Sequence, residues 1–216
     1  MSFLEEMRTH TKDLRERVFS HPFVLGIGDG TLDETRFRFY LAQDYRFLIE
    51  YARVLGLASA KSRDFETQAR FAELLDATLG TEMQLHRNVC AGYGLSSRDL
   101  ERTEPARACF DYTQHLIDVA WSGTLGEICA SLVPCQYGYA EIAGALEDGS
   151  PDGNPYAEWI AAYTSTEYRE LAAWMCGLSE QLAGDATEDE RDAMRRAYFA
   201  SARHEVAFWD MAWNGA

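Results

Sequence analysis

The stretch from Phe37 to Leu55, FRFYLAQDYRFLIEYARVL, decides the fold class of this chain. Its apolar side chains recur at steps of four and three, the spacing that places residues on one face of an α-helix. The pattern predicts a helix from about Glu34 to beyond Ala60. Asp44 interrupts the apolar face of that helix, so a carboxylate is predicted to point inward.

The same helical spacing extends over the rest of the 216 residues, and clean period-2 alternation is hard to find. We therefore predict an all-α protein, a compact helical bundle formed by residues 1–216 as a single domain. Pro134 lies within one apolar stripe and is expected to kink or restart its helix. The GIGDG run at 26–30 is interpreted as a turn, because it lacks the strand and spacing of a dinucleotide-binding loop. A capping-box-like TEDE run predicts that the last helix starts near residue 187. The other helical stripes are predicted at 65–86, 109–119, 128–146, 160–178 and 194–212.

Composition and charge exclude several classes of function. With 47% hydrophobic and 25% charged residues, the chain has the composition of a globular protein. Its 20 basic and 35 acidic residues give a net charge of −15, which repels nucleic-acid phosphates and anionic lipids, so we expect neither as a partner. The N-terminus is acidic where an export signal is basic, and no membrane span is predicted. Five cysteines without a CxxC pair are interpreted as reduced thiols, so we expect a cytoplasmic protein.

Ionisable and polar side chains interrupt several of the apolar stripes. Asp44 and Glu205 are two predicted inward-facing carboxylates, Cys135 lies on the fourth stripe, and Glu82 and His86 are one helical turn apart. Burial is tolerated only for polar groups that are paired or functional, so such interruptions mark candidate sites. Each group alone also fits a structural role, as a hydrogen-bonded carboxylate or a small buried thiol. Together they predict a polar pocket with aromatic walls, to which three different stripes contribute Tyr112, Tyr139 and Tyr163.

Metal binding is the main alternative for these residues. Ferritin-like di-metal bundles use a Glu-x-x-His motif, and none of the five histidines has a glutamate three residues before it. Glu82 and His86 could hold a metal from one helix face, or they could form a carboxylate–imidazole pair that joins two helices. We favour the second role, and we expect no metal and no other cofactor.

Several segments of the chain carry a family signature. They are His21-Pro22-Phe23, the run from Gly28 to Leu32, the block from Phe39 to Leu48 with Gln43-Asp44-Tyr45 inside it, Glu82 with His86, Pro134-Cys135 followed by Tyr137 and Tyr139, and His204-Glu205 followed by Phe208 and Trp209. These segments resemble the TenA/thiaminase II family over nearly the whole chain. The resemblance implies an all-helical, haem-oxygenase-like fold without haem, usually as a homotetramer. It also implies a small-molecule substrate that is hydrolysed at the methylene-linked substituent of a 4-aminopyrimidine.

By position, the resemblance assigns Cys135 as the nucleophile, Glu205 as the proton donor and acceptor, and Asp44 as the residue that binds the pyrimidine. The substrates that it implies are 4-amino-5-aminomethyl-2-methylpyrimidine and, in some members, thiamine itself. Phe47 stands where many members have a tyrosine, so stacking on the pyrimidine is retained and a phenol hydrogen bond is lost. The residues that match the pocket tyrosines of the family are Tyr112, Tyr139 and Tyr163.

The residue types fit this chemistry independently of the resemblance. A carboxylate such as Asp44 can bind the amidine edge of an aminopyrimidine through two parallel hydrogen bonds. A thiolate that adds to the electron-poor ring and an acid that protonates the leaving nitrogen would together expel an amine. Two alternatives stay open: a non-catalytic pyrimidine-binding or transcription-regulatory protein, which would not need Cys135 or Glu205, and a helical metallo-oxygenase on the same fold. The presence of both residues favours an enzyme, and the family resemblance implies that it acts in thiamine salvage.

Overall fold

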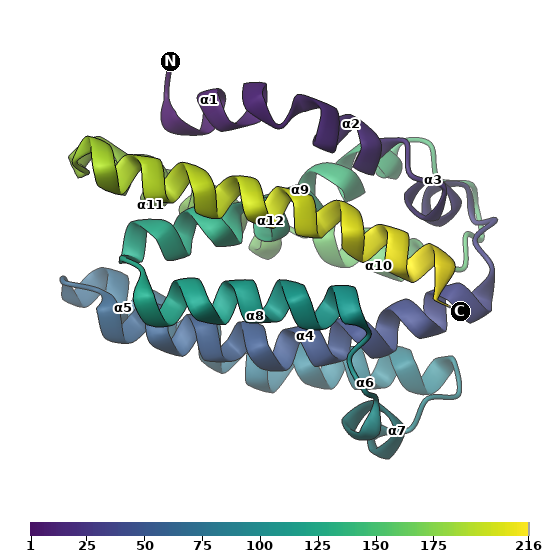
Figure 1. Cartoon of the computed structure of the whole chain (residues 1–216). Helices are drawn as coiled ribbons and strands as arrows, with labels where there is room; N and C mark the ends of the chain where they lie inside the picture. Colours follow the sequence, from purple (N-terminus) through teal and green to yellow (C-terminus); the bar gives the residue numbers. More distant parts are fainter. Residues whose placement is uncertain (216) are drawn as a thin grey trace.

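Helices make up every regular element in the described part of the chain (Figure 1). The computed structural model describes residues 1–215, apart from the side chains of Thr81, Glu82 and Leu85. None of the described helices combines the length and the apolar composition that a membrane crossing requires. In chain order the elements are α1 (Phe3–His10), α2 (Lys12–Phe19), α3 (Pro22–Asp29), α4 (Glu34–Lys61), α5 (Phe65–Ala77), the π-helical segment η1 (Thr78–Glu82), α6 (Met83–Gly92), α7 (Ser97–Arg102), α8 (Arg107–Ser122), α9 (Leu125–Glu147), α10 (Ala157–Thr164), α11 (Thr166–Asp185) and α12 (Glu188–Asn214).

Four long helices, α4, α8, α9 and α12, form the centre of the molecule, and each of them contacts the other three. In Figure 1, α12 crosses the molecule with α1 and α2 along one side and α8 and α4 along the other. The helix α9 packs mainly against α12 and α11, whereas α4 packs mainly against α5 and α8. Side chains on the inner faces of these four helices therefore meet at one place.

Side-chain caps define where the central helices begin. Asp33 accepts a backbone hydrogen bond in the first turn of α4, which starts at Glu34 as predicted. Thr124 starts α9 with a capping box, in which its hydroxyl and the Glu127 carboxylate satisfy each other's backbone N–H groups. Thr187 forms the same motif at the start of α12, so the predicted start of the last helix is confirmed. These caps fix the register of the helices that carry the candidate site.

Aromatic side chains fill the space between the central helices. Tyr40, Tyr112 and Trp209 are among the largest fully buried side chains. Tyr40 of α4 stacks on Trp209 of α12, with ring centroids 5.6 Å apart and planes 14° from parallel. Stacked rings of this size bury much apolar surface and resist sliding. They hold α4 and α12 at a fixed separation beside the site.

The GIGDG run at 26–30 is helical up to Asp29, so its interpretation as a turn is wrong. Pro22 occupies the first turn of α3, where its missing N–H is no loss, and His21 caps the helix by accepting from the Phe23 N–H. Gly30 ends the helix in the left-handed region, at φ 76°, which glycine adopts without strain. Only Gly30 of the run is therefore outside the helix, and it begins the connection to α4 at 30–33.

One further helix prediction needs correction, and of the two outcomes predicted at Pro134 the restart is excluded. The stripe at 160–178 is divided between α10 and α11, because the Ser165 hydroxyl accepts from the Tyr168 N–H and starts a new helix. At Pro134 no helix restarts, and α9 continues from Leu125 to Glu147. Proline removes one main-chain hydrogen bond from a helix. The packing of α9 against α8, α10, α11 and α12 keeps the helix continuous.

Candidate active site

The structure brings the candidate residues together where the four central helices meet. Tyr112 donates a hydrogen bond to Glu205. The charge of Asp44 raises the pKa of Glu205, and the charge of Cys135 raises the pKa of Tyr112. Phe47 packs against the ring of Tyr112. The residues are supplied by α4 (Asp44 and Phe47), α8 (Tyr112), α9 (Cys135 and Tyr139), α10 (Tyr163) and α12 (Glu205).

Glu205 is a buried carboxyl group, with 7% of its surface exposed. The Tyr112 hydroxyl donates a hydrogen bond of 2.7 Å to its Oε1. Burial raises the pKa of Glu205 to about 8; the Tyr112 hydrogen bond opposes this shift, and the charge of Asp44 adds to it. Glu205 is therefore protonated at neutral pH, and it can give a proton to a bound molecule.

Asp44 is the second buried carboxyl group, with 5% of its surface exposed. Burial raises its pKa to about 7. Asp44 Oδ2 lies 3.7 Å from Nδ1 of His86, and Nε2 of the same ring lies 2.8 Å from the Leu41 carbonyl oxygen. A carbonyl oxygen can only accept, so Nε2 donates and Nδ1 of the neutral ring faces Asp44 without a proton. A single proton, on the carboxyl or on the ring, lets the two groups approach.

His86 joins α6 to α4 through this contact and through the Leu41 carbonyl. His86 therefore joins two helices as predicted, and the carboxyl group beside it is that of Asp44. The side chain of Glu82, its predicted partner, lies outside the described residues. Across the side chains that are described, no group of three or more His, Cys, Asp or Glu residues could hold a metal ion.

Aromatic rings form the walls around the two carboxyl groups. Phe47 lies against Tyr51, Tyr112 and Phe208, with ring centroids 6.2, 5.1 and 5.9 Å away. Rings at these separations pack against one another, so Phe47 belongs to a continuous aromatic cluster beside Tyr112. The site therefore combines flat apolar walls with two acids.

The tyrosine hydroxyls supply neutral donors to the same site. The ring centroids of Tyr139 and Tyr163 are 4.9 Å apart. The Tyr40 hydroxyl accepts a 3.2 Å hydrogen bond from Trp159 Nε1. Hydrogen bonding with Tyr139 and Tyr163 also lowers the pKa of Tyr40, against the larger effect of burial. Burial raises the pKa of Tyr40, Tyr112 and Tyr139 well above 10. These phenols therefore stay protonated over the whole physiological range.

Cys135 differs from the other four cysteines in its surroundings. Cys135 is partly exposed. It lies close enough to Tyr112 for its charge to raise the pKa of that phenol, although burial and the charge of Glu205 raise this pKa more. Burial raises the thiol pKa to about 12 at Cys90, Cys109 and Cys176, the last of which is partly exposed and packs against the core as Cys135 does. Such thiols stay protonated and unreactive at neutral pH. Cys135 is the cysteine beside the two acids.

Gln136 and Tyr51 belong to the same surroundings, and no sequence prediction includes Gln136. The Tyr51 hydroxyl donates a 2.6 Å hydrogen bond to Gln136 Oε1. The Gln136 Nε2 group is buried and finds no acceptor among the described residues. An unpaired buried donor costs about 1–3 kcal/mol, which an acceptor atom of a bound molecule would offset. The sequence does contain one indication of this role, because Gln136 is a polar amide within the apolar stretch at 128–140.

A second layer of side chains holds Tyr112 in place. Ser201 is fully buried, and its hydroxyl oxygen lies 3.0 Å from His115 Nε2. Hydrogen bonding with Ser201 also lowers the pKa of Tyr112. The ring of His204 stacks on that of Tyr112, with centroids 5.2 Å apart and planes 11° from parallel. These contacts limit the rotation of the phenol, so its hydroxyl remains directed at Glu205.

The sequence of the chain is similar to that of a known protein family and of its members. Residues 6–215 match the sequence profile of the TENA/THI-4/PQQC family. The chain is 38% identical over 216 residues to a protein of Halalkalibacterium halodurans named aminopyrimidine aminohydrolase, and the alignment covers 99% of this chain and 96% of that protein. The relative is therefore similar over its whole length.

Solved structures give the same result for the fold. The TenA homologue protein from P. horikoshii OT3 superposes with a TM-score of 0.92 at 28% identity, covering 100% of both chains. A domain of unknown function with a heme oxygenase-like fold, from Shewanella denitrificans, superposes with a TM-score of 0.77 at 13% identity, covering 98% of this chain and 92% of that one. The second likeness shows the fold alone. The predicted all-α, haem-oxygenase-like fold is confirmed.

Proposed function

The chain belongs to the TENA/THI-4/PQQC family, and we propose that it is an aminopyrimidine aminohydrolase of the thiaminase II type. The proposed reaction converts 4-amino-5-aminomethyl-2-methylpyrimidine and water into the 5-hydroxymethyl pyrimidine and ammonia. The observation that carries this proposal is the pair of buried acids, Asp44 and Glu205, whose pKa values lie near neutrality beside Cys135. Such values are useful for proton transfer and are not required for helix packing.

Asp44 is the residue that binds the pyrimidine in this proposal. The amidine edge of the ring, a ring nitrogen and the 4-amino group, forms two parallel hydrogen bonds with a carboxylate. A pKa of about 7 suits this role, because a proton passes easily between Asp44 and the ring nitrogen. Phe47, Tyr112, Tyr139 and Tyr163 then surround the planar ring.

Cys135 and Glu205 divide the chemical steps. The Cys135 thiolate forms a bond to the ring, and the added electron pair expels the amine when the methylene C–N bond breaks. Glu205 gives its proton to the leaving nitrogen. Water then adds to the methylene carbon and returns a proton to Glu205, and the thiolate leaves the ring. Thiamine would react in the same way except at the proton transfer: its thiazolium leaves as the neutral thiazole without taking a proton from Glu205, and the proton of the incoming water is released to solvent.

The family resemblance supports three further proposals about the protein as a whole. Residues 1–216 act as a single domain, the active species is a homotetramer, and the protein works in the cytoplasm in thiamine salvage. Sedimentation velocity of the purified protein tests the assembly. A monomer would contradict the tetramer and leave the chemistry unaffected.

Ammonia release against a panel of aminopyrimidines tests the activity. We expect release from the 5-aminomethyl compound and none from the matched 5-methyl compound, which lacks the leaving nitrogen. Calorimetry on the same panel separates binding from turnover. Tight binding without ammonia release would favour the non-catalytic pyrimidine-binding protein, and neither binding nor release would contradict both functions.

A further inference from the structure

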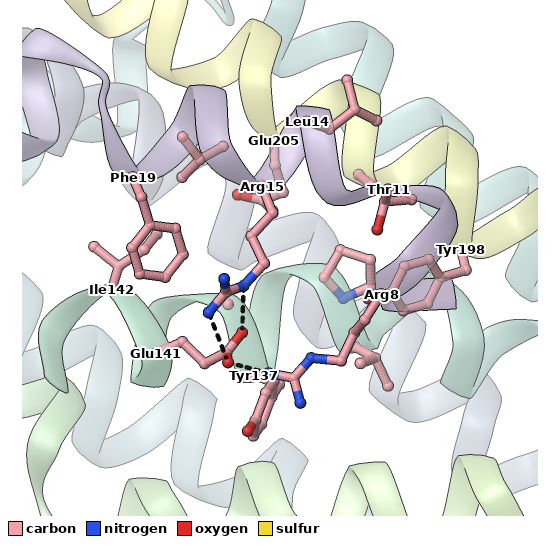
Figure 2. Close-up of a pocket in the computed structure, with 15 residues that line it drawn as sticks. Arg8, Thr11, Leu14, Arg15, Phe19, Tyr137, Glu141, Ile142, Tyr198 and Glu205 are labelled. Atoms are coloured by element: carbon pink, nitrogen blue, oxygen red, sulfur yellow. Dashed lines mark hydrogen bonds and ion pairs between the residues drawn. The ribbon is translucent and has the colours of Figure 1, made fainter. Parts of the chain in front are cut away.

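A cavity of about 70 Å³ lies between the N-terminal helices α1 and α2 and the pair α9 and α12. Figure 2 shows the residues that surround it, with Glu205 on α12 among them. The side chains apart from Glu205 that line its interior are mostly apolar. We call this space the N-terminal cavity; its inner lining includes Leu14 and Val18 of α2, Val133 and Ile142 of α9, and Ala202 and Glu205 of α12.

Two arginines and a glutamate close the outer end of the N-terminal cavity. Arg8 and Arg15 both pair with Glu141, the second at 3.1 Å, and Figure 2 shows both side chains extended toward it. The Arg8 guanidinium also lies over the Tyr137 ring, 5.0 Å from its centroid. Both arginines are exposed in part, whereas Glu205 is buried. The cavity therefore leads from the ion pairs at the surface to the buried acid.

Glu205 is shared between this cavity and the aromatic site. It lines the cavity and accepts the hydrogen bond of Tyr112, whereas Tyr112, Asp44 and Cys135 do not line the cavity. A general acid must reach the leaving nitrogen directly. In the proposed function the pyrimidine is held among Asp44, Tyr112 and Cys135, so its methylene substituent must reach Glu205, and the open space that Glu205 lines is the N-terminal cavity.

We propose that the N-terminal cavity is the leaving-group subsite, which takes ammonia or a short uncharged alkylamine when the C–N bond breaks and supplies the water that replaces it. This inference rests on the proposed hydrolase function and adds the place and the chemical class of the leaving group. The proton that Glu205 gives passes to the nitrogen of the amine. The incoming water, held in the same space, returns one proton to Glu205.

Size and charge define the class of leaving group. A water molecule needs at least about 10–15 Å³ of such space, so the cavity has room for about five water-sized molecules or a short alkyl chain. Arg8 and Arg15 flank the carboxylate of Glu141 at the mouth, so a cationic group entering there would meet two guanidinium groups.

A homologous series of substrates tests the subsite. In the series, the leaving amine of the 5-aminomethyl parent carries a methyl, ethyl, propyl or butyl group, and kcat/KM is expressed relative to the parent. Gly138→Leu should fill the cavity, because Gly138 lines it and an added Cβ meets no atom within 4 Å. Leu14→Ala should enlarge it. Gly177→Leu is the matched control, because its Cβ also meets no atom within 4 Å and Gly177, on α11, is not among the residues that line the cavity.

We expect the relative kcat/KM of Gly138→Leu to fall by about tenfold for each methylene that no longer fits. Leu14→Ala should move the cutoff toward longer amines, and Gly177→Leu should keep the wild-type profile. An unchanged chain-length profile in both cavity variants overturns the subsite and leaves the hydrolase intact. Release of no amine from the parent by the wild-type protein overturns the hydrolase and the subsite together. If one cavity variant loses its cooperative melting, the result is decided by whether the other variant shifts the chain-length cutoff of relative kcat/KM in the expected direction.

Discussion

Cys135 is the single residue whose loss should remove activity most completely. It lies beside Glu205 and Tyr112, whereas Cys176, which is also partly exposed, lies near Arg8 and Glu141. We expect Cys135→Ser to abolish ammonia release and to leave the helical circular dichroism and the melting temperature nearly unchanged, because a hydroxyl is a far weaker nucleophile of similar size. Cys176→Ser is the control and should stay active. Substantial activity in Cys135→Ser would exclude covalent catalysis by this thiol.

Asp44 should affect ligand binding as well as rate. In Asp44→Asn, an amide NH₂ would face a ring donor, and the charge-assisted hydrogen bond to the amidine edge would be lost. We expect pyrimidine affinity to fall by about tenfold or more. Isothermal calorimetry with the hydroxymethyl product measures this without turnover. Equal affinity in wild type and variant would return Asp44 to a structural role with His86, 3.7 Å away.

Glu205 should affect the rate in a way that depends on the leaving group. Glu205→Gln keeps the shape of the side chain and removes its proton, so kcat for the aminomethyl substrate should fall by about 100-fold or more. Thiamine, whose thiazole leaves as a neutral molecule without a proton, should be less sensitive. In the wild type, kcat should fall above about pH 8, where Glu205 ionises. The same loss for both substrates would contradict the general-acid role.

At the scale of helices, sequence patterns predict long elements well and their interruptions poorly. The spacing within 37–55 predicts α4, and the structure gives Glu34–Lys61. The break between α10 and α11 escapes prediction because one serine hydroxyl, at Ser165, outweighs a continuous apolar stripe. The helical conformation of the GIGDG run escapes for the opposite reason, since burial of Gly26 and Gly28 outweighs their weak helix propensity.

The capping box of α12 gives a prediction at the same scale. Thr187→Ala removes the hydroxyl that accepts from the Glu190 N–H at the start of the helix that carries Glu205. We expect the free energy of unfolding to fall by about 1 kcal/mol and the melting temperature by about 2–4 °C. Chemical and thermal denaturation measure the two quantities. Thr9→Ala is the control, because the Thr9 hydroxyl only donates to a carbonyl within α1, and a loss as large there would contradict the assignment.

At the scale of the whole molecule, part of the site could be predicted and part could not. Asp44 and Glu205 are visible in the sequence because a carboxylate in an apolar stripe contradicts the pattern around it. The contact between Asp44 and His86 depends on how α4 and α6 pack, and no spacing along the chain encodes it. The unpaired amide of Gln136 and the N-terminal cavity are likewise products of tertiary packing.

The two buried acids should also make the stability of the whole molecule depend on pH. Burial raises the pKa of Asp44 from 3.8 to about 7 and that of Glu205 from 4.5 to about 8. Between about pH 4 and pH 8 the unfolded chain has already released these protons while the folded protein still binds them. The free energy of unfolding therefore falls as the pH rises through this window, and the contribution of the protonated acids is complete only below it.

Replacing both acids by amides that cannot ionise should remove this part of the pH dependence. We expect the double variant Asp44→Asn with Glu205→Gln to gain at least about 1 kcal/mol of stability relative to wild type between about pH 5 and pH 8.5. Urea denaturation at the two pH values measures the difference, and Asp152→Asn, at an exposed loop position, should change neither curve. Parallel stability curves for the double variant and the wild type would mean that both acids ionise in the folded protein as they do in the unfolded chain. Glu205 would then be ionised at neutral pH, and it could not supply the proton that the leaving amine needs.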